Sequence, residues 1–161
     1  MKIFNFLAVT LFSMSLFALN VGDQAPQISG LKHQTPSAEQ IVADLTSPGK
    51  VTVLEFFATT CSACTENLPF ISQIQSELSD KADFKLVGID RNESLVTNYI
   101  QKYSDMQKFQ VVFDSQRQAS KAYALKYTPT TFVISEEGKV LFKYIGVFEP
   151  ETMDQLRQVL R

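Results

Sequence analysis

The chain contains two cysteines, Cys61 and Cys64, and they stand two residues apart. The β-branched and aromatic run 51–57 before them predicts a strand, and the apolar spacing after them predicts a helix, with Leu68, Ile71, Ile74 and Leu78 on one face. This order puts Cys61 at a helix N-terminus, where free N–H groups and the helix dipole favour a thiolate. Cys64 follows one turn deeper, close enough to form a disulfide. The pair can therefore cycle between dithiol and disulfide.

Two other interpretations of this pair are a structural disulfide and a zinc site. A structural disulfide stabilises mainly by closing a long loop, and the two-residue loop here is short. Zinc needs four ligands, but beside the cysteines the sequence has a single histidine, His33, which we expect in a solvated loop. Redox chemistry without a bound metal or cofactor is thus the favoured interpretation.

Length and charge limit the classes of protein to which the chain can belong. Its 161 residues, 45% of them hydrophobic, are enough for one domain with a real core. The formal net charge of −2 offers no basic field for nucleic acid, so we expect no nucleic-acid partner.

Residues 1–18 have the pattern of a secretory signal peptide. Lys2 supplies the positive start, the stretch 3–17 is mostly apolar, and Ala18 suits a cleavage point. The apolar run is short for a membrane span, which needs about 20 residues, although retention as an anchor is the alternative. We therefore expect residues 19–161 to form one exported domain in the periplasm or another extracytoplasmic compartment.

The hydrophobic pattern of the remaining chain predicts an α/β fold in which parallel strands carry helices on both faces and a hairpin adds antiparallel strands. In particular, Ser37 and Gln40 have the spacing of a capping box that opens a helix. The predicted strands are 27–31, 51–57, 84–90, 111–113, 130–134 and 140–145, and the predicted helices are 37–45, 62–79, 93–103, 117–126 and 150–160.

Several of these segments resemble the thioredoxin superfamily, and within it the exported TlpA/ResA-like thiol-disulfide oxidoreductases of the AhpC/TSA-Redoxin-like branch. The resemblance covers about 21–160, and its carriers are Val53–Cys64, Pro69, Val87–Asp90, Phe113-Asp114, Tyr127–Phe132, Gly138 and Gly146. It implies a thioredoxin-like fold with a central mixed β-sheet flanked by helices. The segment 90–113 looks like the helix-strand insertion that marks this branch.

The resemblance also implies site residues beyond the cysteines. Pro129 is expected to be cis and to pack beside the disulfide, so that the Thr128 backbone can pair with an extended substrate peptide. Asn67 stands where many ResA-like proteins have a functional glutamate, and Leu86 stands where the lysine partner of the buried acid is expected.

Glu55 interrupts an apolar strand six residues before Cys61. On a strand it shares a face with Val53 and Phe57, which predicts a buried acid beneath the cysteines. Desolvation would raise its pKa and suit it to proton transfer with Cys64. The alternative is a strand-edge carboxylate bonded to solvent. Asp90, at a strand end, is expected to cap a helix or to belong to a turn.

These observations predict an exported thiol-disulfide oxidoreductase with Cys61 as nucleophile and Cys64 as resolving cysteine. It would reduce disulfides in exported client proteins, apocytochrome c being one candidate, and would take electrons from a membrane thiol donor, as a monomer. Two alternatives are a thiol oxidase that donates disulfides and a redox-silent, thioredoxin-like module that binds peptides.

Overall fold

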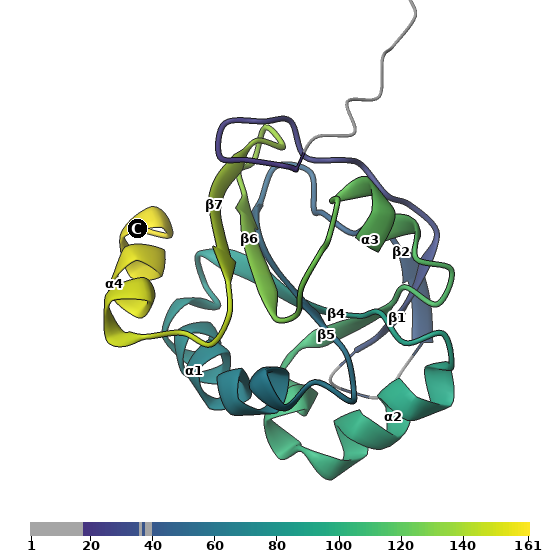
Figure 1. The fold of residues 1–161 in the computed structure, drawn as a ribbon. Coiled ribbons are helices and arrows are strands. Elements are labelled where there is room, and N and C mark those ends of the chain that lie inside the picture. Colours follow the sequence, from purple (N-terminus) through teal and green to yellow (C-terminus); the bar gives the residue numbers. More distant parts are fainter. Residues whose placement is uncertain (1–17, 36, 38–39) are drawn as a thin grey trace, which may run out of the picture.

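A computed structural model describes residues 18–35, 37 and 40–161. The described residues form a seven-stranded sheet in the order β2-β1-β5-β4-β3-β6-β7, with helices packed against it (Figure 1). The elements are β1 Leu31–Gln34, β2 Gln40–Ala43, β3 Val51–Phe57, α1 Ser62–Leu78, β4 Ala82–Gly88, α2 Glu93–Lys102, the 3₁₀ helix η1 Ser104–Lys108, β5 Gln110–Phe113, α3 Gln118–Ala122, β6 Thr130–Ile134, β7 Val140–Ile145 and α4 Pro150–Val159.

The sheet is mixed, and its centre is parallel. β3, β4 and β5 run parallel, while β6 pairs antiparallel with β3 and is followed by antiparallel β7. On the other side β1 pairs antiparallel with β5 and with β2. The helix-strand insertion therefore adds α2 and β5 to a thioredoxin-like sheet, which confirms the predicted fold class.

Each face of the sheet has its own apolar core. The face under α1, α2 and α4 buries a set that includes Phe57, Leu68, Ile74, Tyr99 and Leu156. The opposite face, under α3 and the N-terminal segment, buries Leu54, Phe56, Val112, Tyr123 and Phe132. Because β3 is central and covered on both faces, its side chains alternate between the two cores and all but the first are buried.

The N-terminal part differs from the predicted structure. The predicted helix 37–45 is wrong: Gln40–Ala43 is the edge strand β2, paired antiparallel with β1 in the register Lys32↔Val42. Pairing with β1 is a long-range interaction that overrides the local capping signal. The strand predicted at 27–31 begins only at Leu31. The predicted signal segment, apart from Ala18, lies outside the described residues.

Helix α3 is shorter than predicted. It spans Gln118–Ala122, because Ala124 has a φ of 48° and so leaves the helical conformation. The buried Asp114 carboxylate accepts hydrogen bonds from the N–H groups of Ala119 and Ser120 and from the Ser120 hydroxyl. Asp114 thus fixes the start of this short helix.

His33 is not the solvated loop residue that we predicted. It lies on β1 and is fully buried, and neither ring nitrogen has a hydrogen-bond partner among the described residues. Burial, reinforced by the nearby Lys85 ammonium, lowers the pKa of His33 to about 4. The long-range strand pairing that buries it is absent from the local sequence pattern.

His33 should consequently make stability depend on pH. Between pH 6.5 and about 4 the unfolded chain binds a proton at this position and the folded chain does not, so its contribution to stability falls as the pH falls, by up to about 3 kcal/mol. We expect His33→Leu to gain stability relative to the unsubstituted protein across this range. Urea unfolding of both proteins at several pH values measures this difference, and parallel pH profiles would contradict the expectation.

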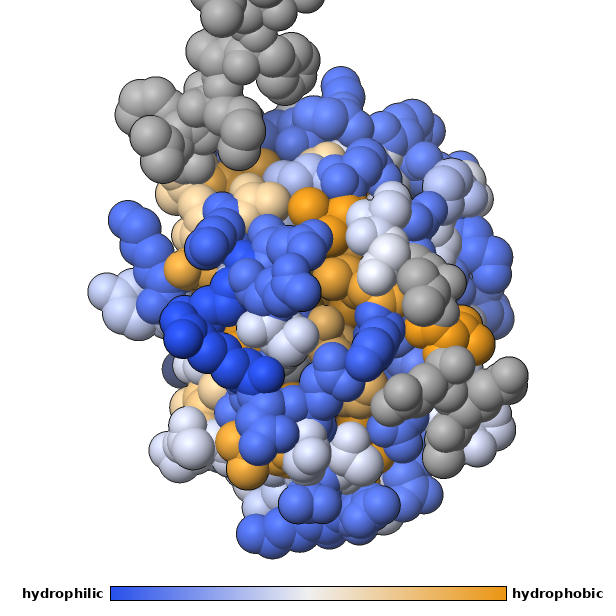
Figure 2. Space-filling view, turned by 90° about the vertical axis from the view of Figure 1, so that its right-hand side faces the viewer, coloured by the Kyte–Doolittle hydropathy of each residue, from blue (hydrophilic) through white to orange (hydrophobic). Residues whose placement is uncertain are grey.

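No helix among the described residues is long and apolar enough to cross a membrane. The face seen in Figure 2 is covered mainly by polar side chains, with a narrower band of apolar side chains between them. The acidic formal charge of −2 agrees with a surface that lacks a basic field.

Candidate functional site

The two cysteines form a disulfide at the start of α1. Cys61 is the N-cap residue, with extended backbone angles, and Cys64 lies in the first turn, at a Cα–Cα distance of 5.3 Å. The Cys64 N–H points at Cys61 Sγ, 3.1 Å away. Cys61 is partly exposed, whereas Cys64 is 3% exposed. One sulfur thus faces solvent and receives a backbone donor, and the other is buried, as the sequence predicted.

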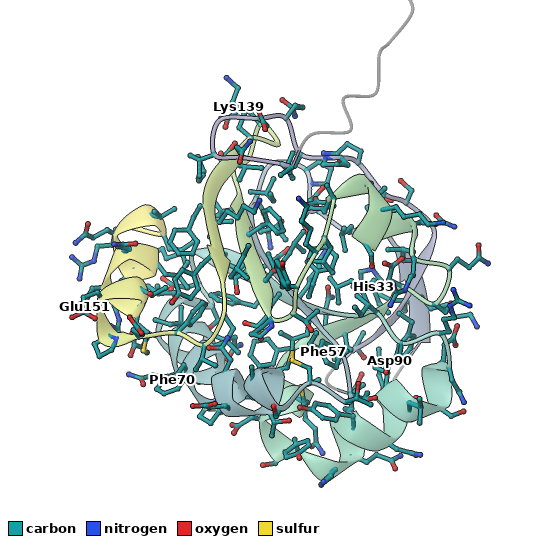
Figure 3. The ribbon with its side chains drawn as sticks, viewed as in Figure 1. His33, Phe57, Phe70, Asp90, Lys139 and Glu151 are labelled. Atoms are coloured by element: carbon teal, nitrogen blue, oxygen red, sulfur yellow. A yellow bond between two sulfur atoms is a disulfide. The ribbon has the colours of Figure 1, made fainter. Side chains whose placement is uncertain are left out.

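The segment between β3 and the cysteines is held by Asp90. This carboxylate accepts hydrogen bonds from the Thr59 N–H at 3.0 Å and from the Thr59 hydroxyl at 2.7 Å. Figure 3 shows Asp90 on the same side of the molecule as the disulfide, which lies next to Phe57 at the end of β3. Asp90 is therefore not a helix cap: Asn92 caps α2, through its side chain and the Ser94 N–H.

Removing this carboxylate should loosen the segment that leads to Cys61. Asp90→Ala leaves the Thr59 N–H and hydroxyl without their partner, and the loss of hydrogen bonds to a charged group is expected to cost about 2 to 3 kcal/mol of unfolding free energy. Asp80→Ala is the control, because Asp80 is an exposed carboxylate in an ion pair with Lys81. Equal unfolding free energies for the two variants would contradict a bracing role for Asp90.

The segment before β6 approaches the cysteines from the other side. The Thr128-Pro129 peptide bond is cis, as the resemblance implied, and Pro129 is buried. The Thr128 carbonyl oxygen lies 3.4 Å from Cys61 Sγ. The neighbouring Tyr127 is 65% exposed. The structure thus brings Thr128 and Pro129 beside the partly exposed sulfur.

Glu55 lies beneath α1, on the face of β3 that the strand pattern predicted. It is 3% exposed, and its Oε2 accepts hydrogen bonds from Asn67 Nδ2 at 2.8 Å and from the Thr131 hydroxyl at 3.2 Å. Burial raises the pKa of Glu55 to about 7, and the two hydrogen bonds offset this only in part. The carboxyl group therefore exchanges protons near neutral pH, as a proton-transfer group must.

No described cation offsets the burial of Glu55. Its direct partner on β4 is Leu86, whereas Lys85 points to the opposite face, where its ammonium donates to the Asp44 carbonyl and the Ser47 hydroxyl. A positive neighbour would stabilise the carboxylate and hold its pKa low. The apolar partner leaves desolvation as the dominant influence.

The role of Asn67 was not predicted from the sequence. This side chain is fully buried on α1 and connects Glu55 with the Phe148 N–H, which donates to Asn67 Oδ1 at 2.7 Å. Its position one turn after Cys64 marked it only as a departure from the family. Helical spacing of Cys64, Asn67 and Ile71 on the buried face could have indicated an inward-pointing amide.

The insertion also reaches the first turn of α1. The Tyr99 hydroxyl lies 2.7 Å from the Thr65 hydroxyl, and the Tyr99 ring packs on Phe57 with centroids 5.6 Å apart. Burial raises the pKa of Tyr99, so it stays neutral near pH 7. Among the described residues, no cluster of three or more histidine, cysteine or acidic side chains could hold a metal ion.

Comparisons with known proteins agree with this geometry. The model of the Redoxin family matches residues 20–160. The thiol-disulfide oxidoreductase ResA of a Bacillus cereus strain is 30% identical over 115 residues, which cover 70% of this chain and 63% of ResA. The sporulation thiol-disulfide oxidoreductase A of Bacillus subtilis (strain 168) is 30% identical over 114 residues, covering 68% and 66%. The chain spans just under two thirds of the length of these relatives.

Among solved structures, a candidate thiol:disulfide interchange protein DsbE from Chlorobium tepidum superposes with a TM-score of 0.73 at 28% identity, covering 88% of this chain and 96% of that one. StoA from Bacillus subtilis superposes with a TM-score of 0.67 at 24% identity, covering 84% and 97%. Both likenesses support the thioredoxin-like fold, and the ResA relative supports the TlpA/ResA-like branch.

Proposed function

Since the chain belongs to the Redoxin family, we propose that it is a thiol-disulfide oxidoreductase that reduces disulfides in exported client proteins. The observation that carries this proposal is the asymmetry of the Cys61–Cys64 pair. Cys61 sulfur is partly exposed at a helix N-cap with a backbone donor on it, whereas Cys64 sulfur is buried behind it. A thiolate is favoured at the first sulfur, which therefore attacks.

The reaction is a pair of thiol-disulfide exchanges. The Cys61 thiolate attacks one sulfur of the client disulfide, which forms a mixed disulfide and releases the other client sulfur as a thiolate that takes up a proton. Cys64 then loses its proton and attacks Cys61 Sγ, which releases the second client thiol and closes the Cys61–Cys64 disulfide. Two electrons pass to the client, so a dithiol donor must reduce the protein before the next cycle.

We assign proton transfer at Cys64 to Glu55. The carboxyl group is buried under the first turns of α1, bonded to Asn67 one turn after Cys64, and its pKa of about 7 leaves it partly ionised at neutral pH. A carboxylate in this state can accept the proton that Cys64 must lose, directly or through a water molecule. Supporting this role, no described cation holds the pKa of Glu55 low.

Thr128 and Pro129 are proposed to receive the client. The Thr128 carbonyl is 3.4 Å from the attacking sulfur, so an extended client segment bonded to this backbone would bring its own sulfur to Cys61. The exposed Tyr127 ring beside them adds apolar contact area.

Cellular context enters as part of the same proposal. Residues 1–18 would direct export, with cleavage or retention as an anchor, and residues 19–161 would act as a monomeric domain in the periplasm or another extracytoplasmic compartment. There a membrane thiol protein would supply electrons, because an oxidising compartment does not reduce the pair by itself. Apocytochrome c is one candidate client.

A stoichiometric assay tests the activity. The protein is reduced with dithiothreitol, freed of the reagent and mixed with excess insulin, and the thiols released on insulin are counted. We expect one insulin disulfide to be reduced per protein molecule, and none with the Cys61→Ser/Cys64→Ser variant. Equal thiol counts for the two proteins would contradict the proposal.

A further inference from the structure

Asn67 connects the buried acid with the chain segment that follows β7. Its Nδ2 lies 2.8 Å from Glu55 Oε2, and its Oδ1 lies 2.7 Å from the Phe148 backbone nitrogen. All three groups are buried, since Asn67, Glu55 and Phe148 are 0%, 3% and 2% exposed. Buried hydrogen bonds of this kind are strong and hold a single geometry.

The Phe148 contact fixes which way the Asn67 amide points. A backbone N–H can only donate, so the atom facing Phe148 must be the carbonyl oxygen Oδ1. The NH₂ group then faces Glu55 and can only donate. The carboxyl group therefore always meets a donor on this side, which favours its ionised form.

The two donors on Glu55 meet the same oxygen. Asn67 Nδ2 and the Thr131 hydroxyl both approach Oε2, whereas Oε1 makes no hydrogen bond to the described residues. A proton on Oε2 would compete with these donors. Oε1 is consequently the oxygen that can take a proton without breaking a bond.

The segment that holds Phe148 also contacts the proline beside the cysteines. We define the 146–149 loop as the residues between β7 and α4. Its Gly146 N–H donates to the Pro129 carbonyl at 3.0 Å, and its Val147 carbonyl accepts from the Tyr144 hydroxyl at 3.3 Å. The loop thus reaches from the proposed client side of the site to the Asn67 amide.

We propose that Asn67 is the positioning residue of this site: it holds Glu55 with Oε1 as the proton-carrying oxygen and transmits the protonation state of the carboxyl group to the 146–149 loop. The proposal rests on the proposed function, in which Glu55 takes the proton of Cys64. It adds a connection between that proton and the loop next to the client segment.

The other groups around Glu55 allow a clean titration in the oxidised protein. Cys64 on α1 is in the disulfide and does not titrate, and the raised pKa of Tyr99 on α2 keeps it neutral. The neighbouring strands contribute the uncharged Leu86 and Thr131. A proton transition near pH 7 at this place therefore belongs to Glu55.

The test is an NMR pH titration of the oxidised full chain that follows the Glu55 side-chain carboxyl carbon and the Phe148 amide together. In the unsubstituted protein we expect both signals to change with the same midpoint, near pH 7. In Glu55→Gln the Phe148 transition should disappear. A Phe148 transition that survives in Glu55→Gln would overturn the connection.

Two Asn67 variants test the positioning role. Asn67→Leu removes the donor and should raise the Glu55 midpoint by about one pH unit, since a hydrogen bond to a charged group stabilises it by about 1.5 to 3 kcal/mol. It should also abolish the Phe148 transition. Asn67→Asp keeps an acceptor for Phe148 but puts a second carboxyl group beside Glu55, so one shared proton should persist to a still higher pH.

Ser72→Ala is the matched control, because Ser72 is a buried polar residue of the same helix that bonds Asp105 instead of Glu55. It should leave both midpoints unchanged. An unchanged Glu55 midpoint in folded Asn67→Asp or Asn67→Leu protein would overturn the proposal. The titration uses no client, so its failure is distinct from a failure of the insulin assay.

Discussion

Replacing Cys61 with serine is expected to abolish disulfide reduction, whereas Cys64→Ser should keep the first attack and accumulate mixed disulfides with the client. Cys61 carries the partly exposed sulfur at the helix N-cap, so the protein without it has no nucleophile that a client can reach. Without Cys64 the mixed disulfide has no resolving thiol. We expect turnover below detection in both variants and stable adducts in Cys64→Ser alone.

The measurement combines non-reducing electrophoresis of each variant after mixing with insulin and alkylation rates of the reduced protein. Cys61 should be alkylated faster than Cys64, because Cys64 is 3% exposed. Faster labelling of Cys64, or adducts formed by Cys61→Ser alone, would reverse the assigned roles.

Glu55→Gln is the second change with a large expected effect, and the effect should fall on resolution and not on the first attack. The unsubstituted protein should resolve its mixed disulfide faster as the pH rises through about 7, because only the carboxylate form of Glu55 accepts a proton. Glutamine has nearly the same shape and cannot accept it. Resolution near neutral pH should slow by a factor of about 100 or more.

Rapid-mixing kinetics that record attack and resolution separately check this result. Glu66→Gln is the control, since Glu66 is an exposed carboxylate of the same helix. Because Cys64 and Glu55 titrate together in the reduced protein, the pH profile gives apparent values for the pair. Unchanged resolution in Glu55→Gln would reduce Glu55 to a structural residue.

The same substitution should raise stability where the carboxylate is ionised. The pKa of Glu55 is about 7 in the folded protein and 4.5 without burial, so the folded chain holds a proton that the unfolded chain has lost. Stability from this group falls as the pH rises from 4.5 to about 7, by up to about 3 kcal/mol. His33 has the opposite slope between pH 4 and 6.5. Each effect is therefore visible only as a difference between a variant and the unsubstituted protein.

The parts of the site that follow from local pattern could be predicted. A strand, a short turn and a helix around Cys61 and Cys64 are encoded by neighbouring residues, and the resemblance supplied Thr128 and Pro129. Glu55 was predictable because its large apolar strand neighbours indicate burial on both sides. In these segments local preference and tertiary packing agree.

The remainder depends on pairings between distant residues. β2 is a strand because β1 lies beside it, and His33 is buried because β1 is covered by that pairing and by β5. Asn67 acquires its role from Phe148, 81 residues further along the chain. Asp90 was assigned to a cap because its position at a strand end does not show that Thr59 will lie beside it.

The reduction potential of the Cys61–Cys64 pair tests the central claim most directly. The protein is equilibrated with dithiothreitol or glutathione buffers of known potential, and the fractions of dithiol and disulfide are measured after acid quenching and alkylation. A client reductase should have a value near that of thioredoxin, roughly −270 mV. A value near roughly −120 mV would make the protein a disulfide donor, and a pair that does not cycle would leave only a peptide-binding module.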